Sequence, residues 1–122
     1  MIKKEFDIHK RIYKFVLDVL KFLRKLPRTQ ENLVIIGQIA RSVTSVGAND
    51  QEADGVSTKR EFIHCYTVVR RELKETAYWL RLILDLNPRL SSGAQKLIAE
   101  GEELIKIVSK IINNARRGKK SI

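Results

Sequence analysis

Apolar residues recur every three or four positions along nearly the whole chain, a spacing that collects them on one face of an α-helix. The clearest run is Ile8, Ile12, Phe15, Val19, Phe22 and Leu26. The chain holds only two prolines and six glycines, the strongest helix breakers. Its 122 residues are enough for one domain with a packed core. The pattern therefore predicts a single all-α domain over residues 1–122.

Three breaks divide the chain into four helices. They fall at Pro27, at Gly55 and at Asn87-Pro88. A basic tail at 116–122 follows the predicted helices, which span residues 7–26, 30–54, 59–86 and 92–115. Connections of about three to six residues join antiparallel neighbours. We therefore expect an antiparallel up-down-up-down four-helix bundle.

Capping boxes mark two of the predicted helix starts. Thr58 and Glu61 are spaced to satisfy the first backbone N–H groups of the third helix. Ser92 and Gln95 have the same spacing before the fourth helix. Both helices should therefore begin at these residues.

The second predicted helix contains two apolar stripes and two glycines. Ile35, Ile39 and Val46 lie beside the main predicted seam, which runs through Leu33, Ile36, Ala40, Val43 and Gly47. Glycine inside a helix costs roughly 1 kcal/mol relative to alanine. We expect close approach of a neighbouring helix at Gly37 and Gly47 to offset that cost.

The chain is basic, and its charge is unevenly distributed. It has 24 Lys and Arg against 14 Asp and Glu, a net charge of +10. Residues 1–28 carry a net +6 and residues 89–122 a net +5, whereas residues 29–55 carry −3. Because the first and last helices of such a bundle are often neighbours, their charges are expected to merge into one positive face.

A positive face of this kind favours a polyanionic partner. We predict nucleic acid, with RNA as the first choice, bound through phosphate contacts that weaken with salt. A solvated face that only aids solubility is the alternative. The predicted contacts are Lys10, Arg11, Lys14, Lys21, Arg24, Lys25 and Arg28 from the first helical segment and Lys110, Arg116, Arg117, Lys119 and Lys120 from the chain end.

The sequence also bears on the compartment. A single cysteine cannot form an internal disulfide, which fits a reducing environment. The first residues lack the apolar run of a signal peptide, and no stretch approaches 18 uninterrupted apolar residues. We expect a cytoplasmic protein with no membrane partner.

Few residues point to catalysis. Glu61 and His64 have the Glu-x-x-His spacing of di-iron bundles, but such a site needs a second pair and the only other histidine is His9. His64 and Cys65 point about 100° apart on a helix, so they do not form a catalytic pair. Cys65 is expected to be a small buried residue. The sequence predicts no catalytic residue, metal or cofactor, and a protein that is not an enzyme.

The acidic stretch from Asn49 to Asp54 lacks the spacing of oxygen ligands in a calcium loop. We interpret it as a solvated helix C-terminus, or as a partner for Arg and Lys side chains on another helix or subunit.

Tyr78 and Trp79 lie close in sequence to Arg70, Arg71 and Arg81. Aromatic and arginine side chains together can stack on single-stranded bases. They also serve as interface anchors, or pack against a core. All three interpretations stay open.

Two motifs give the chain a family resemblance. Residues 38–52 follow the pattern Q-I-x-R-(S/A)-x-x-S-(I/V)-x-x-N-x-x-E, with Ser45, Asn49 and Glu52 on the fixed positions. Residues 58–62 match a Ser/Thr-Lys-(Lys/Arg)-Glu-Phe helix start, and residues 72–82 match its Tyr-Trp-Leu-Arg end. Together they resemble the four-helix bundle proteins known as 23S rRNA intervening-sequence proteins. Ala53 stands where that family usually has a glycine.

The resemblance implies a four-helix bundle that assembles as a homopentamer, and it carries no catalytic residues. The related accessory variability determinant proteins of diversity-generating retroelements resemble basic pentamers that bind nucleic acid and a reverse transcriptase. The alternative function is therefore a protein-interaction scaffold, or an accessory subunit of an enzyme such as a reverse transcriptase, without direct nucleic-acid contact. The residues assigned to an oligomer interface or family motif are Ser45, Asn49, Glu52, Tyr78 and Trp79.

Overall fold

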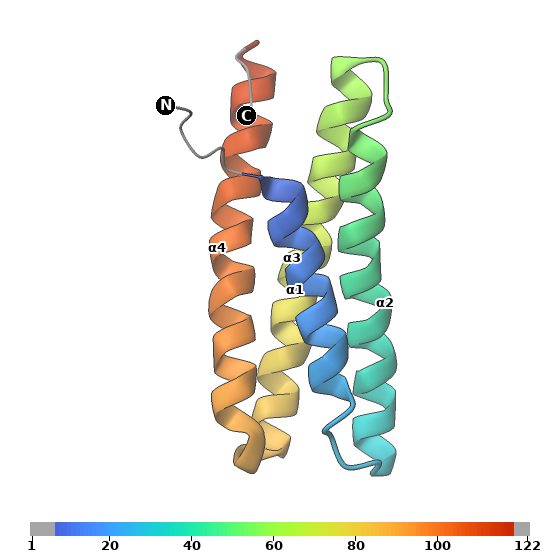
Figure 1. The fold of residues 1–122 in the computed structure, drawn as a ribbon, viewed down its shortest axis with the longest axis vertical. Helices are drawn as coiled ribbons and strands as arrows, with labels where there is room; N and C mark the ends of the chain where they lie inside the picture. The colour runs from blue at the N-terminus through green and yellow to red at the C-terminus, as the bar shows by residue number, and fades with distance from the viewer. Residues whose placement is uncertain (1–6, 119–122) are drawn as a thin grey trace.

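Within residues 7–118, which the computed structural model describes, the chain forms four α-helices and one short 3₁₀ helix (Figure 1). They are α1 (Ile8–Leu23), α2 (Gln30–Ala53), α3 (Lys59–Leu86), η1 (Pro88–Leu90) and α4 (Ser91–Arg116). No strand occurs in this part of the chain, so the all-α prediction is confirmed. The α1–α2 and α3–α4 connections lie at one end of the bundle, here called the basal end, and the α2–α3 connection lies at the other (Figure 1).

Side-chain caps begin three of the helices. Asp7 and Thr29 accept hydrogen bonds from the backbone N–H groups of Lys10 and Asn32, at 3.1 and 3.2 Å. Thr58 accepts one from the N–H of Glu61 at 3.1 Å, and the Glu61 carboxylate accepts from the N–H of Ser57 at 3.3 Å. The predicted pairing of Thr58 and Glu61 at the start of the third helix is therefore present, with the Glu61 carboxylate bonded to the N–H of Ser57 rather than to that of Thr58.

The capping box predicted at Ser92 is wrong. Pro88 starts the 3₁₀ turn η1, which runs directly into α4, so that Ser91 and Ser92 already lie inside the helix. Leu90 occupies the N-cap position and makes no side-chain cap. The fixed φ of proline suits the first position of a helical turn, which explains why the chain is already wound before Ser92.

The first helix ends at Leu23, three residues before its predicted end. Backbone N–H groups of residues 24–26 bond to carbonyls three residues earlier, at 3.0–3.3 Å, so the last turn tightens. Pro27 disfavours the α conformation in the residue that precedes it. Leu26 is buried all the same, so the apolar seam continues beyond the helix.

The core follows the predicted seam of α1, and on α2 it takes Val43 of the predicted main seam together with the stripe beside it. Ile35, Ile39 and Val46 are buried, whereas Leu33 is 52% exposed. Because α2 packs against both α1 and α3, its buried face is the one between those two neighbours. The prediction that Leu33 belongs to the main seam is therefore wrong.

The expected close approach at glycine is found at one of the two predicted positions. A Cβ on Gly47 would lie 3.4 Å from Val16 of α1, whereas one on Gly37 would meet nothing within 4 Å. Gly101 of α4 supplies a further close approach, because a Cβ there would lie 3.3 Å from Phe15. None of the helices in residues 7–118 is long and apolar enough to cross a membrane.

Candidate nucleic-acid interface

Two of the predicted cations on α1 are neutralised by acids. Arg11 Nε and Nη2 donate to the Glu100 carboxylate of α4 at 2.7 and 2.9 Å. Lys14 Nζ donates to Asp18 at 2.7 Å, one turn along α1. These hydrogen bonds raise the pKa of both basic groups above their usual values. Helices α1 and α4 are in contact, as expected, but the surface between them carries both signs of charge.

A second group of cations gathers at the basal end. In the part of the chain that the structure describes, these side chains form no ion pair, and all are exposed. Arg28 bonds only to the carbonyl of Leu23, at 3.4 Å. Arg89 of η1, which the sequence reasoning missed, joins the group because it lines the same cavity as Lys25. We call this group the basal cluster; its members are Lys21, Arg24, Lys25, Arg28 and Arg89.

The remaining predicted cations lie elsewhere. Arg116 ends α4 and Arg117 caps it, at the far end of a helix whose 26 residues span about 39 Å. Lys110 lies less than two turns before that end, and Lys10 lies at the start of α1; both are exposed. Lys119 and Lys120 fall outside the described residues. Within residues 7–118, the structure therefore separates the basal cluster from the cations of the chain end by most of the length of α4.

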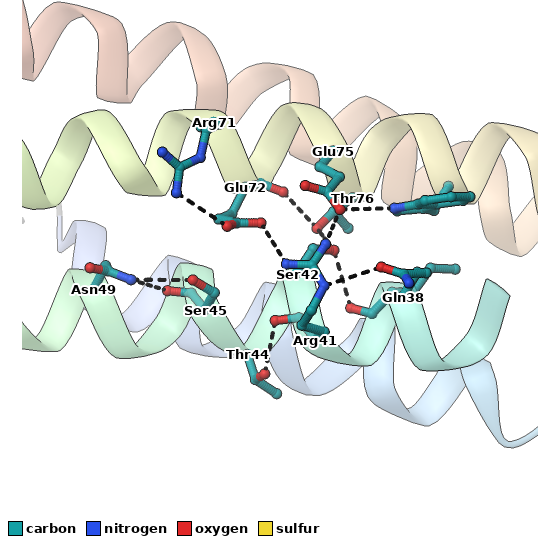
Figure 2. A network of polar contacts seen from close by, with 12 residues as sticks. Gln38, Arg41, Ser42, Thr44, Ser45, Asn49, Arg71, Glu72, Glu75 and Thr76 are labelled. Atoms are coloured by element: carbon teal, nitrogen blue, oxygen red, sulfur yellow. Dashed lines mark hydrogen bonds and ion pairs between the residues drawn. The ribbon is translucent and has the colours of Figure 1, made fainter. Parts of the chain in front are cut away.

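The family-motif residues lie along the interface between α2 and α3 (Figure 2). Arg41 bonds to Gln38 at 3.1 Å, and it reaches across to Glu72 and Glu75 of α3. The hydroxyls of Ser42 and Thr76 are 2.7 Å apart and buried. The motif positions thus serve first to join these two helices.

The other motif residues lie further along α2 and α3. Asn49 Nδ2 donates to the carbonyl and hydroxyl of Ser45 at 3.0 and 3.2 Å (Figure 2). Trp79 is half-buried and donates its indole N–H to Glu75 at 3.1 Å. Tyr78 is exposed and packs edge-on against Trp79, whereas Glu52 is exposed near the end of α2. Of the aromatic pair, Tyr78 is the one that presents its ring to solvent.

A buried carboxylate, Asp50, links three helices, whereas Glu52 and Asp54 of the same acidic stretch are exposed as expected. Asp50 is 1% exposed, and its oxygens lie 3.0 and 2.9 Å from His9 Nδ1 of α1. Tyr66 of α3 donates its hydroxyl to Asp50 at 2.7 Å. Asp50 lies at helical spacing from Val43 and Val46, on the same face of α2. This spacing was a sequence signal that Asp50 is buried.

These contacts change how the linked groups titrate. Burial lowers the pKa of His9, but its hydrogen bond to Asp50 and the charges of Asp50, Asp54 and Asp7 raise that pKa overall. Burial and the bond to Asp50 raise the pKa of Tyr66 above its usual range. The hydrogen bonds among His9, Asp50 and Tyr66 hold the start of α1 against α2 and α3.

The residues considered for catalysis are scattered. Cys65 is buried, as predicted, and burial raises the pKa of its thiol. Glu61 caps α3, and His64 is exposed. Within residues 7–118, no three His, Cys, Asp or Glu side chains are grouped so that they could hold a metal ion.

Comparison with known proteins gives the relationship of the chain. The profile of the 23S rRNA-intervening sequence protein family matches residues 4–110. No curated protein matches the chain. A solved structure from Bacteroides thetaiotaomicron, a protein of unknown function from the S23 ribosomal protein family, is 26% identical. The alignment covers 87% of this chain and 98% of that one, with a TM-score of 0.79. The chain therefore belongs to the 23S rRNA-intervening sequence protein family.

Proposed function

We propose that this protein is a non-enzymatic, basic helical bundle that binds nucleic acid, RNA in the first place, through phosphate contacts. The observation that carries the proposal is the basal cluster, in which five exposed cations from the end of α1 and the two basal connections form no ion pair within residues 7–118. Phosphates attract such groups strongly, whereas cations already bonded to carboxylates contribute less. Arg11 and Lys14 are therefore removed from the set of principal contacts. The described cations that lie away from the basal cluster are removed as well; they are Lys10, Lys110, Arg116 and Arg117.

The salt dependence of binding tests this proposal. If all five cations contact the phosphates of a single strand, the logarithm of the association constant should fall linearly with the logarithm of the salt concentration. The expected slope is roughly −3.5 for each bound protein molecule. Removing Lys21 and Arg24 together should reduce the magnitude of that slope by roughly 1.4. Fluorescence anisotropy of a labelled RNA at several salt concentrations measures both values.

The matched control removes two cations from the opposite half of α4, Lys110 and Arg116. It lowers the net charge equally, so it should weaken binding only through the general field. Absence of RNA binding by the unmodified protein at low salt would refute the proposed function. Equal effects of the two double variants would refute the role of the basal cluster.

We further propose that the bundle, with its helices running up-down-up-down, assembles into a homopentamer. Large apolar side chains on α1 and α2 support an assembly, because their exposure to water is unfavourable. They are Tyr13, Leu17, Leu33 and Val34. Light scattering should give a mass near five times 14.1 kDa, and Val34→Glu should lower it. A monomer would refute the pentamer.

The same exposed apolar residues favour the second candidate function, a scaffold or accessory subunit for a protein such as a reverse transcriptase. Under that function, mixing with the partner protein would yield a stable complex whose formation depends on Val34 and Leu33. RNA binding would then be absent, or would not change when the basal cluster is altered. The RNA titration described above therefore separates the two functions.

A further inference from the structure

A cavity of about 430 Å³ opens at the basal end, beside the basal cluster. Its volume falls within the range of small-molecule sites, roughly 300–1,000 Å³. It combines an apolar lining with two cations contributed by different connections of the bundle. The side chains that line it include Lys25, Pro27, Leu86, Pro88, Arg89 and Leu90.

A reciprocal amide pair fixes the wall of this cavity. Asn32 Nδ2 donates to Asn87 Oδ1 at 2.9 Å, and Asn87 Nδ2 donates to Asn32 Oδ1 at 3.1 Å. Asn32 Nδ2 also donates to the Pro27 carbonyl at 2.9 Å, and Asn87 Nδ2 to the Ile83 carbonyl at 2.9 Å. These four bonds hold the α1–α2 connection against the end of α3. The cavity is thus formed before any ligand arrives.

The exposed lining explains what kind of ligand fits. Leu86 is 47% exposed although it is a large apolar residue. Pro27 and Pro88 line the same cavity. A nucleobase presents a flat apolar face to such a surface, while its phosphate requires cations within reach. Lys25 and Arg89 supply those cations at the same cavity.

We propose that this cavity binds one unpaired nucleotide of a single-stranded RNA. The base lies against Leu86 and Pro88, and the adjoining phosphate lies between Lys25 and Arg89. Bases in a duplex are stacked and paired, so their faces are covered and none enters the cavity. The inference rests on the proposed function and adds a preference for single strands, which phosphate contacts alone do not provide.

Two RNA probes test the cavity: a short labelled single strand and a duplex of the same length, both followed by fluorescence anisotropy. Leu86→Gln should weaken binding of the single strand roughly fivefold, because one apolar contact to the base is lost, and leave duplex binding unchanged. The matched control is Ala99→Gln, since Ala99 is exposed on α4 and lies outside this cavity. It should change neither affinity.

A second pair of variants tests the two cations. Lys25→Ala with Arg89→Ala should weaken binding of both probes more than Lys10→Ala with Lys110→Ala, which removes the same charge elsewhere. Circular dichroism checks that each variant keeps the helical content of the parent protein.

The outcomes separate the two proposals. If the protein binds RNA but Leu86→Gln leaves the ratio of the two affinities unchanged, the cavity proposal is wrong and the proposed function stands. A preference of the parent protein for the duplex also overturns the cavity proposal. If the parent protein binds neither probe at low salt, the proposed function itself fails.

Discussion

Replacing His9 by asparagine should make the stability of the bundle less dependent on pH. His9 Nδ1 lies 3.0 and 2.9 Å from the two oxygens of Asp50, whose side chain is 2% exposed. An asparagine amide can donate a hydrogen bond from a similar position, but it cannot take up a proton. The variant thus removes the charge of His9 while keeping a hydrogen bond from a neutral donor to Asp50.

The size of the effect follows from the exposure of the pair. The parent protein and the variant both donate a hydrogen bond to the Asp50 carboxylate, so only the attraction between opposite charges is lost, which contributes about 0.2–1 kcal/mol at exposed sites. One third of the His9 side chain is exposed, so solvent screens the interaction. We therefore expect the variant to lose up to about 1 kcal/mol of unfolding free energy under acidic conditions.

The sign of the pH dependence follows from the raised pKa of His9. Although burial lowers that pKa, the bond to Asp50 and the charges of Asp50, Asp54 and Asp7 raise it overall. A folded-state pKa above the ordinary value of 6.5 stabilises the native protein fully below 6.5. This contribution disappears as the pH rises through the folded-state pKa.

Urea unfolding followed by circular dichroism at about pH 5.5 and about pH 9 measures the effect. The difference between the parent protein and His9→Asn should be largest at the lower pH. His64→Asn is the control, because His64 is exposed on α3 and has no hydrogen bond or ion pair within residues 7–118. Equal differences at both pH values for His9→Asn would refute the reasoning, as would the same pH dependence in the control.

Further predictions concern stability. Tyr66→Phe removes the 2.7 Å bond to buried Asp50 and should lower the unfolding free energy by about 1.5–3 kcal/mol in urea denaturation; no change would contradict this. Gly37→Ala should raise the unfolding free energy by about 0.5–1 kcal/mol, since a Cβ meets nothing within 4 Å and alanine favours the helix. Gly101→Ala should gain less or destabilise, because its Cβ would lie 3.3 Å from Phe15, and thermal unfolding of both variants compares them.

Much of the fold was predictable because local signals agreed with the tertiary packing. The cap at Thr58 and the breaks at Pro27 and Asn87 depend on backbone geometry, which neighbouring residues determine. The α1 seam from Ile8 to Leu26 was predicted correctly because its residues recur at helical spacing, and the structure buries all six of them. The family was also predicted from local sequence, because residues 38–52, 58–62 and 72–82 match its motifs in the expected order.

The predictions were wrong where the local sequence pattern is compatible with more than one arrangement of the helices. Two apolar stripes of α2 have helical spacing, and only the positions of α1 and α3 decide that Ile39 is buried and Leu33 exposed. The pairing of Arg11 with Glu100 joins residues 89 positions apart, so no local signal could show that this cation is neutralised. Arg89 was missed because its place beside Lys25 depends on two connections meeting in space.

The Asn32–Asn87 pair also has a consequence for the order of folding. It joins residues 55 positions apart, one near the start of α2 and the other at the end of α3. Both partners belong to the α2–α3 hairpin, at the end opposite its connection, so the pair forms only when these two helices dock along their whole length. Local helical contacts form sooner than contacts that close long loops. Slow exchange of the Asn32 and Asn87 side-chain amide protons would therefore report docking itself, separately from helix formation.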